Sequence, residues 1–219
     1  LIYIANGDLV AQPFDPDTGK LSGSPTPLVG NVMTVPGAAK SVFSVSRNGS
    51  LVYLRGEAAE DATLSWRNRT GQEIETIVDP APYDMVALSP DERSAVVGII
   101  TRLAGTWDLW IVDLARNFKT RFTIDPADDA DMVWSSDSRG VYFVSDREDF
   151  QGVYFKEIGS PDPPELVYSP GGPMLRLAEI SADESTLIFS LEDDESGWDI
   201  FALDITLPEA EARLVRQTP

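Results

Sequence analysis

Cysteine and histidine are both absent from this sequence of 219 residues. Without cysteine the chain can form neither a disulfide framework nor a thiolate metal site, and its redox compartment is left open. Without histidine it lacks the usual general base at neutral pH and the commonest ligand of transition metals. A conventional Ser-His-Asp triad is therefore excluded.

Basic residues are scarce. Lysine and arginine number 17 against 36 aspartates and glutamates, which gives a net charge of −19. Such an excess repels nucleic acid phosphates and anionic membranes, so neither is an expected partner. Cations and basic partners are compatible with it. The alternative is that the acidic surface serves solubility alone.

Long apolar runs and catalytic motifs are missing as well. No run of about 18 apolar residues predicts a membrane span, and we expect no direct membrane insertion of this segment. The sequence has no G-x-S-x-G elbow, no phosphate-binding loop and no kinase signature. We therefore expect no catalytic activity, and any catalytic domain would lie outside this chain. The chain opens on Leu1-Ile2-Tyr3-Ile4 and ends at Thr218-Pro219, which suggests a piece of a longer protein.

What the sequence does contain is a serine-led turn that recurs. The four serines lie 43, 46 and 46 residues apart, and a constant period of this size indicates a repeat architecture. Serine and aspartate at these places stiffen tight turns, and a catalytic site is needed only once, so the motif is interpreted as structural. The copies are Ser46-Arg47-Asn48-Gly49, Ser89-Pro90-Asp91-Glu92-Arg93, Ser135-Ser136-Asp137-Ser138-Arg139 and Ser181-Ala182-Asp183-Glu184-Ser185.

Short β-forming runs surround each turn. In the clearest copy, Met132-Val133-Trp134 leads into the turn and Val141-Tyr142-Phe143-Val144 leaves it, which predicts a hairpin. A third run follows, such as Asp108-Leu109-Trp110, and then a weaker and more polar fourth run, such as that at 119–124. Four strands in about 45 residues are typical of one propeller blade.

The sequence therefore predicts an all-β propeller of four-stranded antiparallel blades in a single domain. The first unit has runs matching only the second, third and fourth strands, so its inner strand is missing. About five blades are expected, at 1–36 (partial), 37–80, 81–126, 127–170 and 171–219.

These residues resemble the TolB-like, WD-like propeller repeats of bacteria, whose usual turn reads S-P-D-G-[KR]. Ser89 to Arg93 fits at four of five positions, and the Trp134 to Asp137 group fits less tightly. The opening segment at 8–15, Asp-Leu-Val-Ala-Gln-Pro-Phe-Asp, is also similar to propellers carried behind bacterial eukaryotic-type serine/threonine kinase domains.

The resemblance implies a ring of six or more blades and a non-catalytic scaffold that binds a protein, peptide or small ligand. It implies a sensory or partner-binding module of a larger bacterial protein, and a periplasmic or other extracytoplasmic location. The alternative is the gating propeller of a prolyl-oligopeptidase-type hydrolase.

Two candidate sites lie in the connections that lead into the inner strands. In the first, several carboxylates of the acidic stretch at 125–131 would converge on calcium or magnesium through oxygen ligands, since no other cofactor is expected. The alternative is a solvated acidic loop. The candidate metal ligands are Asp125, Asp128, Asp129 and Asp131.

The second candidate site is a ring of side chains at the mouth of the central channel. Residues at the same place in successive blades would form a mixed aromatic, acidic and basic surface for a peptide or small ligand. The alternative is that they are ordinary loop residues. The candidates are Lys40, Tyr83, Asp84, Asp129, Asp131 and Arg176.

Overall fold

The computed structural model describes residues 1–5, 8–15, 18–30, 32, 34–35, 40–41, 43–46, 50–54, 61–68, 70–101, 106–148, 150–172, 174–193, 197–207 and 210–217. Within these residues the chain forms 23 strands and no helix. No helix in this part of the chain could therefore span a membrane.

The last three blades are complete, and each is a four-stranded antiparallel sheet in chain order. Blade 3 contains β12 (Tyr83–Leu88), β13 (Ser94–Thr101), β14 (Thr106–Asp113) and β15 (Phe118–Arg121). Blade 4 contains β16 (Asp129–Trp134), β17 (Gly140–Ser145), β18 (Gly152–Glu157) and β19 (Glu165–Tyr168). Blade 5 contains β20 (Leu175–Ile180), β21 (Thr186–Asp193), β22 (Gly197–Asp204) and β23 (Arg213–Arg216).

The first two blades are less regular. Blade 1 is a three-stranded sheet of β1 (Ile2–Ala5), β2 (Asp8–Ala11) and β5 (Thr26–Val29). Blade 2 consists of two pairs that lie against each other, β8 (Phe43–Val45) with β9 (Leu51–Tyr53), and β10 (Ala62–Arg67) with β11 (Glu73–Ala81). Two short hairpins project from the blades, β3 (Phe14–Asp15) with β4 (Lys20–Leu21), and β6 (Thr34–Val35) with β7 (Lys40–Ser41).

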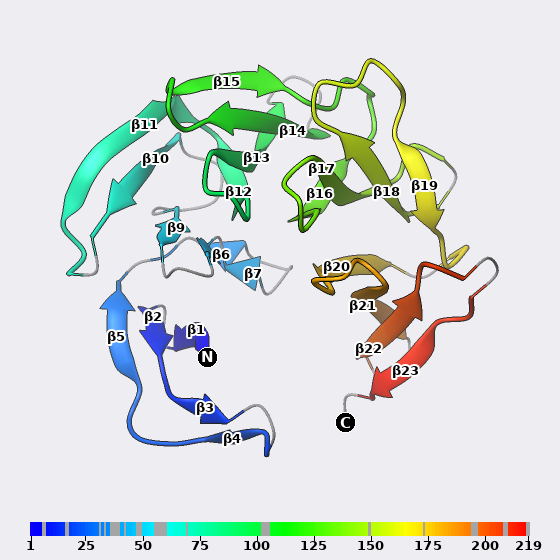
Figure 1. Ribbon diagram of the computed structural model, residues 1–219, viewed down its shortest axis with the longest axis horizontal. Helices are drawn as coiled ribbons and strands as arrows, with labels where there is room; N and C mark the ends of the chain where they lie inside the picture. Colours follow the sequence, from blue (N-terminus) through cyan, green and yellow to red (C-terminus); the bar gives the residue numbers. More distant parts are fainter. Residues whose placement is uncertain are drawn as a thin grey trace.

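The sheets follow one another around a common axis, as Figure 1 shows. The first strands of blades 3 to 5 lie nearest the axis and the fourth strands lie at the rim. An opening separates the β3–β4 hairpin from β23, so the blades form an arc. The predicted all-β propeller of four-stranded antiparallel blades is confirmed, and within the described residues blade 1 has three strands.

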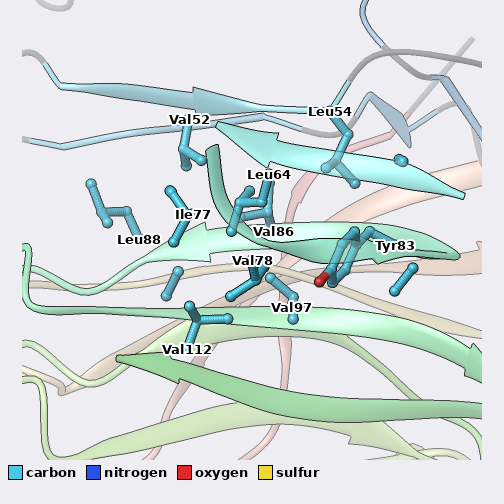
Figure 2. Packing of buried hydrophobic residues seen from close by; sticks show 13 residues of the cluster. Val52, Leu54, Leu64, Ile77, Val78, Tyr83, Val86, Leu88, Val97 and Val112 are labelled. Atoms are coloured by element: carbon cyan, nitrogen blue, oxygen red, sulfur yellow. The ribbon is translucent and has the colours of Figure 1, made fainter. Parts of the chain in front are cut away.

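The core of the molecule lies between the blades. Four clusters of buried apolar side chains occupy the four interfaces between successive blades. Figure 2 shows the cluster between blades 2 and 3, where Leu64 and Ile77 face Val86 and Val97. Strand alternation puts one row of side chains against each neighbouring blade, so each blade is stabilised by the blades beside it.

The repeated turns have one geometry. In blade 3, Ser89 Oγ donates to Asp91 Oδ1 at 2.7 Å, and the same oxygen of Asp91 accepts from the backbone N–H of Arg93. The equivalent bonds recur in the turns at 135–139 and 181–185. The fourth turn residue is left-handed in each, with φ of 60° at Glu92, 63° at Ser138 and 55° at Glu184. Residues 47–49 of the first copy lie outside the described residues.

Successive turns are also bonded to one another. The Ser138 hydroxyl accepts from the backbone N–H of Asp91 at 3.1 Å. One Glu184 oxygen accepts from both the backbone N–H and the hydroxyl of Ser136, at 2.6 and 2.7 Å. The left-handed fourth residue of one turn therefore binds the turn of the preceding blade.

The hydrogen-bonded aspartates of these turns lead to a prediction about how folding stability depends on pH. Hydrogen bonds from Ser181 and Ser185 lower the pKa of Asp183 from 3.8 to about 2. A carboxylate with a lowered pKa stabilises the fold above its unfolded-state pKa, and this contribution is lost as the pH falls through the folded-state pKa. We expect the free energy of unfolding of Asp183→Asn to change less between about pH 4 and pH 2 than that of the wild type. Urea unfolding across this range measures it, and an unchanged pH dependence would contradict the expectation.

Candidate functional site

The predicted ring of channel-mouth residues is largely buried. Tyr83, Asp129 and Leu175 begin the inner strands of blades 3, 4 and 5 and lie opposite Ile99, Ser145 and Leu191. Because all three side chains are buried, Asp129 occupies a core position at which the neighbouring blades carry a large apolar or aromatic side chain.

Asp129 is held by an arginine of its own blade. Its Oδ1 lies 2.8 Å from Nη2 of Arg147, and both side chains are withdrawn from solvent. The Arg147 guanidinium also lies over the rings of Phe143 and Tyr154, at 5.3 and 4.9 Å from the centroids, which favours a desolvated cation. Burial raises the pKa of Asp129, and hydrogen bonds from Ser145 and Thr123 and the charge of Arg147 oppose that rise.

Asp131 and Arg176 are two predicted ring residues that the structure brings together. Arg176 Nη1 of blade 5 lies 3.6 Å from Asp131 Oδ2 of blade 4, and the guanidinium lies 5.9 Å from the Trp198 ring centroid. Asp131 has a φ of 51°, and its backbone N–H donates to Met85 Sδ of blade 3. These contacts join three blades at the inner strand of the middle one.

Tyr83 and Asp84 lie at the start of β12. Tyr83 donates its hydroxyl to the Asp79 carbonyl at 2.8 Å and accepts from Lys119 Nζ at 3.0 Å. Burial, with the charge of Asp79, raises the pKa of Tyr83 to about 12. Asp84 is buried at the irregularity between Tyr83 and Met85 in β12. Lys40 pairs with Val35 in the β6–β7 hairpin, and its side chain lies outside the described residues.

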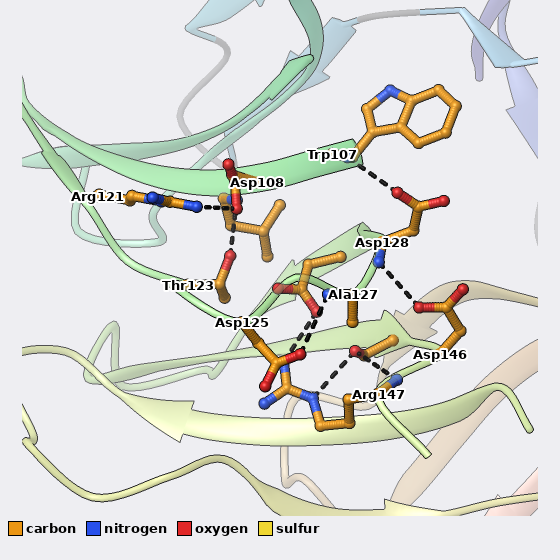
Figure 3. Close-up of polar contacts among 12 residues, drawn as sticks. Trp107, Asp108, Arg121, Thr123, Asp125, Ala127, Asp128, Asp146 and Arg147 are labelled. Atoms are coloured by element: carbon orange, nitrogen blue, oxygen red, sulfur yellow. Dashed lines mark hydrogen bonds and ion pairs between the residues drawn. The ribbon is translucent and has the colours of Figure 1, made fainter. Parts of the chain in front are cut away.

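In the acidic loop, carboxylate oxygens accept hydrogen bonds from backbone N–H groups (Figure 3). Asp125 Oδ1 accepts from the N–H of Ala127, and Asp128 Oδ1 accepts from the N–H of Trp107. The N–H of Asp128 in turn donates to Asp146 Oδ1 at 2.8 Å. In the part of the chain that the structure describes, no group of three or more acidic side chains could hold a metal ion. A calcium or magnesium site formed by Asp125, Asp128, Asp129 and Asp131 stays a prediction.

Sequence reasoning expected a central channel but did not identify the residues that line it. A cavity of about 960 Å³ extends along the inner strands of blades 2 to 5 and reaches Leu1 and Ile2 of blade 1. Small and apolar side chains such as Ala87, Val133 and Ala178 line it, and Glu179 has the only charged side chain among its described lining residues. None of the five ring residues whose side chains the structure describes lines it.

The comparisons with known proteins agree on the fold. No protein-family profile matches the sequence, and no curated protein matches it. Among solved structures, TolB from Acinetobacter baumannii is similar with a TM-score of 0.72 at 17% identity, over 97% of this chain and 50% of that one. A TolB described as putative, from Agrobacterium tumefaciens, is similar with a TM-score of 0.75 at 16% identity, over 99% of this chain and 76% of that one.

A prolyl endopeptidase is also similar, with a TM-score of 0.56 at 21% identity, over 79% of this chain and 29% of that one. The chain thus spans half the length of the first TolB and under a third of the peptidase. Identities this low show the fold alone. This fold is a TolB-like β-propeller.

Proposed function

We propose that this chain is a non-catalytic propeller scaffold that binds a protein or peptide partner at its axis. The observation that carries the proposal is the hollow of about 960 Å³ between the inner strands. Its volume lies at the upper end of the range of about 300–1,000 Å³ that is usual for ligand pockets. Its walls come from successive blades, so several weak contacts from a rigid frame would act together.

The lining indicates the chemistry of the partner. Apolar side chains from β12, β16 and β20 favour apolar groups, and the Glu179 carboxylate favours a basic group. The net charge of −19 would also attract a basic partner over a distance and repel nucleic acid.

A sensory module of a larger bacterial protein, with an extracytoplasmic location, remains our interpretation of the family resemblance. The similarity to a prolyl endopeptidase supports a second candidate, a propeller that gates access to a hydrolase domain. The full-length gene product distinguishes the two, because a kinase catalytic loop supports the sensor and a G-x-S-x-G motif with a later histidine supports the hydrolase.

Filling the hollow tests partner binding. Ala178 is exposed at an irregularity of β20 and lines the hollow, so Ala178→Trp places a large ring inside it. For a peptide selected from a random library on the wild-type chain, we expect at least a tenfold loss of affinity, or about 1.4 kcal/mol. Fluorescence anisotropy measures it.

The matched control is Ala115→Trp, in the exposed turn between β14 and β15 on the rim. This variant should bind the selected peptide as the wild type does. Equal affinity of the wild type and Ala178→Trp would place the binding surface elsewhere and overturn the proposal.

A further inference from the structure

The axial hollow extends along one end of the inner strands. The inner strands of blades 3, 4 and 5 begin at residues 83, 129 and 175, and each runs into a serine-led turn. The residues that line the hollow begin at Met85, Met132 and Leu177 and continue into the turns. The first two residues of each strand, all of which the structure describes, do not line it. The hollow therefore lies toward the turns.

The starts of the inner strands are occupied by packed side chains. Tyr83 and Leu175 are buried in the clusters between blades, and Asp129 is buried beside Arg147 of its own blade. These side chains contact their own blades and the blades beside them, so this end of the strands provides no wall for the hollow.

The turns at the other end are exposed to solvent. In each of the turns at 89–93, 135–139 and 181–185, the first and third residues are hydrogen-bonded to each other. The second residue takes no part in that bond, is exposed, and lines the hollow; these residues are Pro90, Ser136 and Ala182. The hollow therefore opens at the face formed by these turns, which we call the turn face.

Glu179 lies just inside this opening. It stands two residues before the first serine of its turn, and the residues at this place in blades 2, 3 and 4 are Ser44, Ala87 and Val133. All four residues line the hollow. Glu179 is the one member of this set that carries a charge, so blade 5 departs here from the other blades.

The Glu179 carboxylate is available to a partner. Its side chain is exposed, and Oε1 accepts from the backbone N–H of Ile180 at 3.1 Å. No lysine or arginine among the described residues forms an ion pair with it. Apolar walls lower the effective dielectric constant, so a cation inside the hollow would be attracted more strongly than one in open solvent.

We propose that a peptide segment of the partner enters the hollow from the turn face and places a lysine or arginine side chain against Glu179. Apolar groups of the same segment pack against the inner strands of blades 3 and 4, and the second turn residues border its path. Glu179 is then the residue that selects a basic partner. This assignment rests on the proposed function and specifies the partner and its direction of entry.

A change of charge tests the role of Glu179. The probe is the peptide selected from a random library on the wild-type chain. It should contain a lysine or arginine whose replacement by methionine weakens binding to the wild type about fivefold but weakens binding to Glu179→Gln less than about twofold. Fluorescence anisotropy measures all four affinities.

The matched control for this test is Glu165→Gln, on the exposed outer strand of blade 4. It has the same net charge as Glu179→Gln and should bind the selected peptide as the wild type does. A selected peptide without a basic residue, or equal losses in the wild type and Glu179→Gln for each of its basic residues, would overturn the role of Glu179.

Association rates test the direction of entry. Ala182→Trp places a large ring at the turn face, and Met174→Trp places the same ring at the opposite end of β20, just before its first residue. In stopped-flow experiments, association of the selected peptide should be about tenfold slower with Ala182→Trp and unchanged with Met174→Trp. Entry from the turn face is wrong if Ala182→Trp slows association no more than Met174→Trp does.

This assignment and the proposed function can fail separately. If Ala178→Trp abolishes binding of the selected peptide while Glu179→Gln and Ala182→Trp bind it as the wild type does, the hollow binds partners and the assignment of Glu179 and of the turn face is wrong. If Ala178→Trp binds the peptide unchanged, the proposed function itself is wrong.

Discussion

Asp129→Ala is expected to lower the free energy of unfolding by about 3–5 kcal/mol, the range found when one partner of a buried ion pair is removed. The substitution leaves the Arg147 guanidinium without its carboxylate over the Phe143 and Tyr154 rings, where only 13% of the Arg147 side chain is exposed. Urea unfolding followed by tryptophan fluorescence measures the loss.

A double substitution provides the control for this prediction. Tyr83 and Leu175 show that the Asp129 position accommodates large side chains of low polarity in the neighbouring blades. Asp129→Leu combined with Arg147→Met should therefore be close to neutral, or stabilising by about 1–4 kcal/mol, because no charge remains buried. If the double variant were no more stable than Asp129→Ala, an unpaired charge would not explain the loss.

Phe189→Ala has the second large expected effect, a loss of about 3–5 kcal/mol from the interface between blades 4 and 5. Phe189 is fully buried, with its ring 5.0 Å from that of Tyr168 and 6.0 Å from that of Phe201. Blade 5 has one neighbouring blade within the described residues, so we expect it to open before blades 3 and 4 do.

Amide exchange across the strands tests this order of opening. In Phe189→Ala the amides of β21 and β22 should exchange faster than in the wild type, and those of β13 should keep their protection. Phe118→Ala is the matched control, because its ring is 64% exposed and its loss should change stability by no more than about 0.5 kcal/mol. If amide exchange became faster by the same factor in all blades, the arc would unfold as one unit, and the expected order of opening would be wrong.

The fold could be predicted because its signals are local. In the turn at 135–139, the Ser135 hydroxyl and the Asp137 carboxylate both accept from the backbone N–H of Arg139, within the same five residues. The flanking runs are rich in residues suited to a half-buried sheet, and the constant period gives the order of the blades.

The site was harder to predict because its contacts join distant residues. Asp129 stands in an acidic stretch, which favours a solvated loop or a cation site. Its burial depends on Arg147, which is 18 residues away, and the Asp131 contact depends on Arg176 in the next blade. No sequence motif marks the lining of the axial hollow, because its lining residues come from separate strands of successive blades.

Two of the polar contacts between blades 4 and 5 lie toward opposite ends of one inner strand. Asp131 meets Arg176 near the start of β16, and Glu184 meets Ser136 in the turn just after that strand ends. Together the two contacts, one toward each end of this inner strand, resist tilting of blade 5 about the apolar cluster between the blades. We therefore expect the loss of either contact to let the inner strands of blades 4 and 5 move apart at that end.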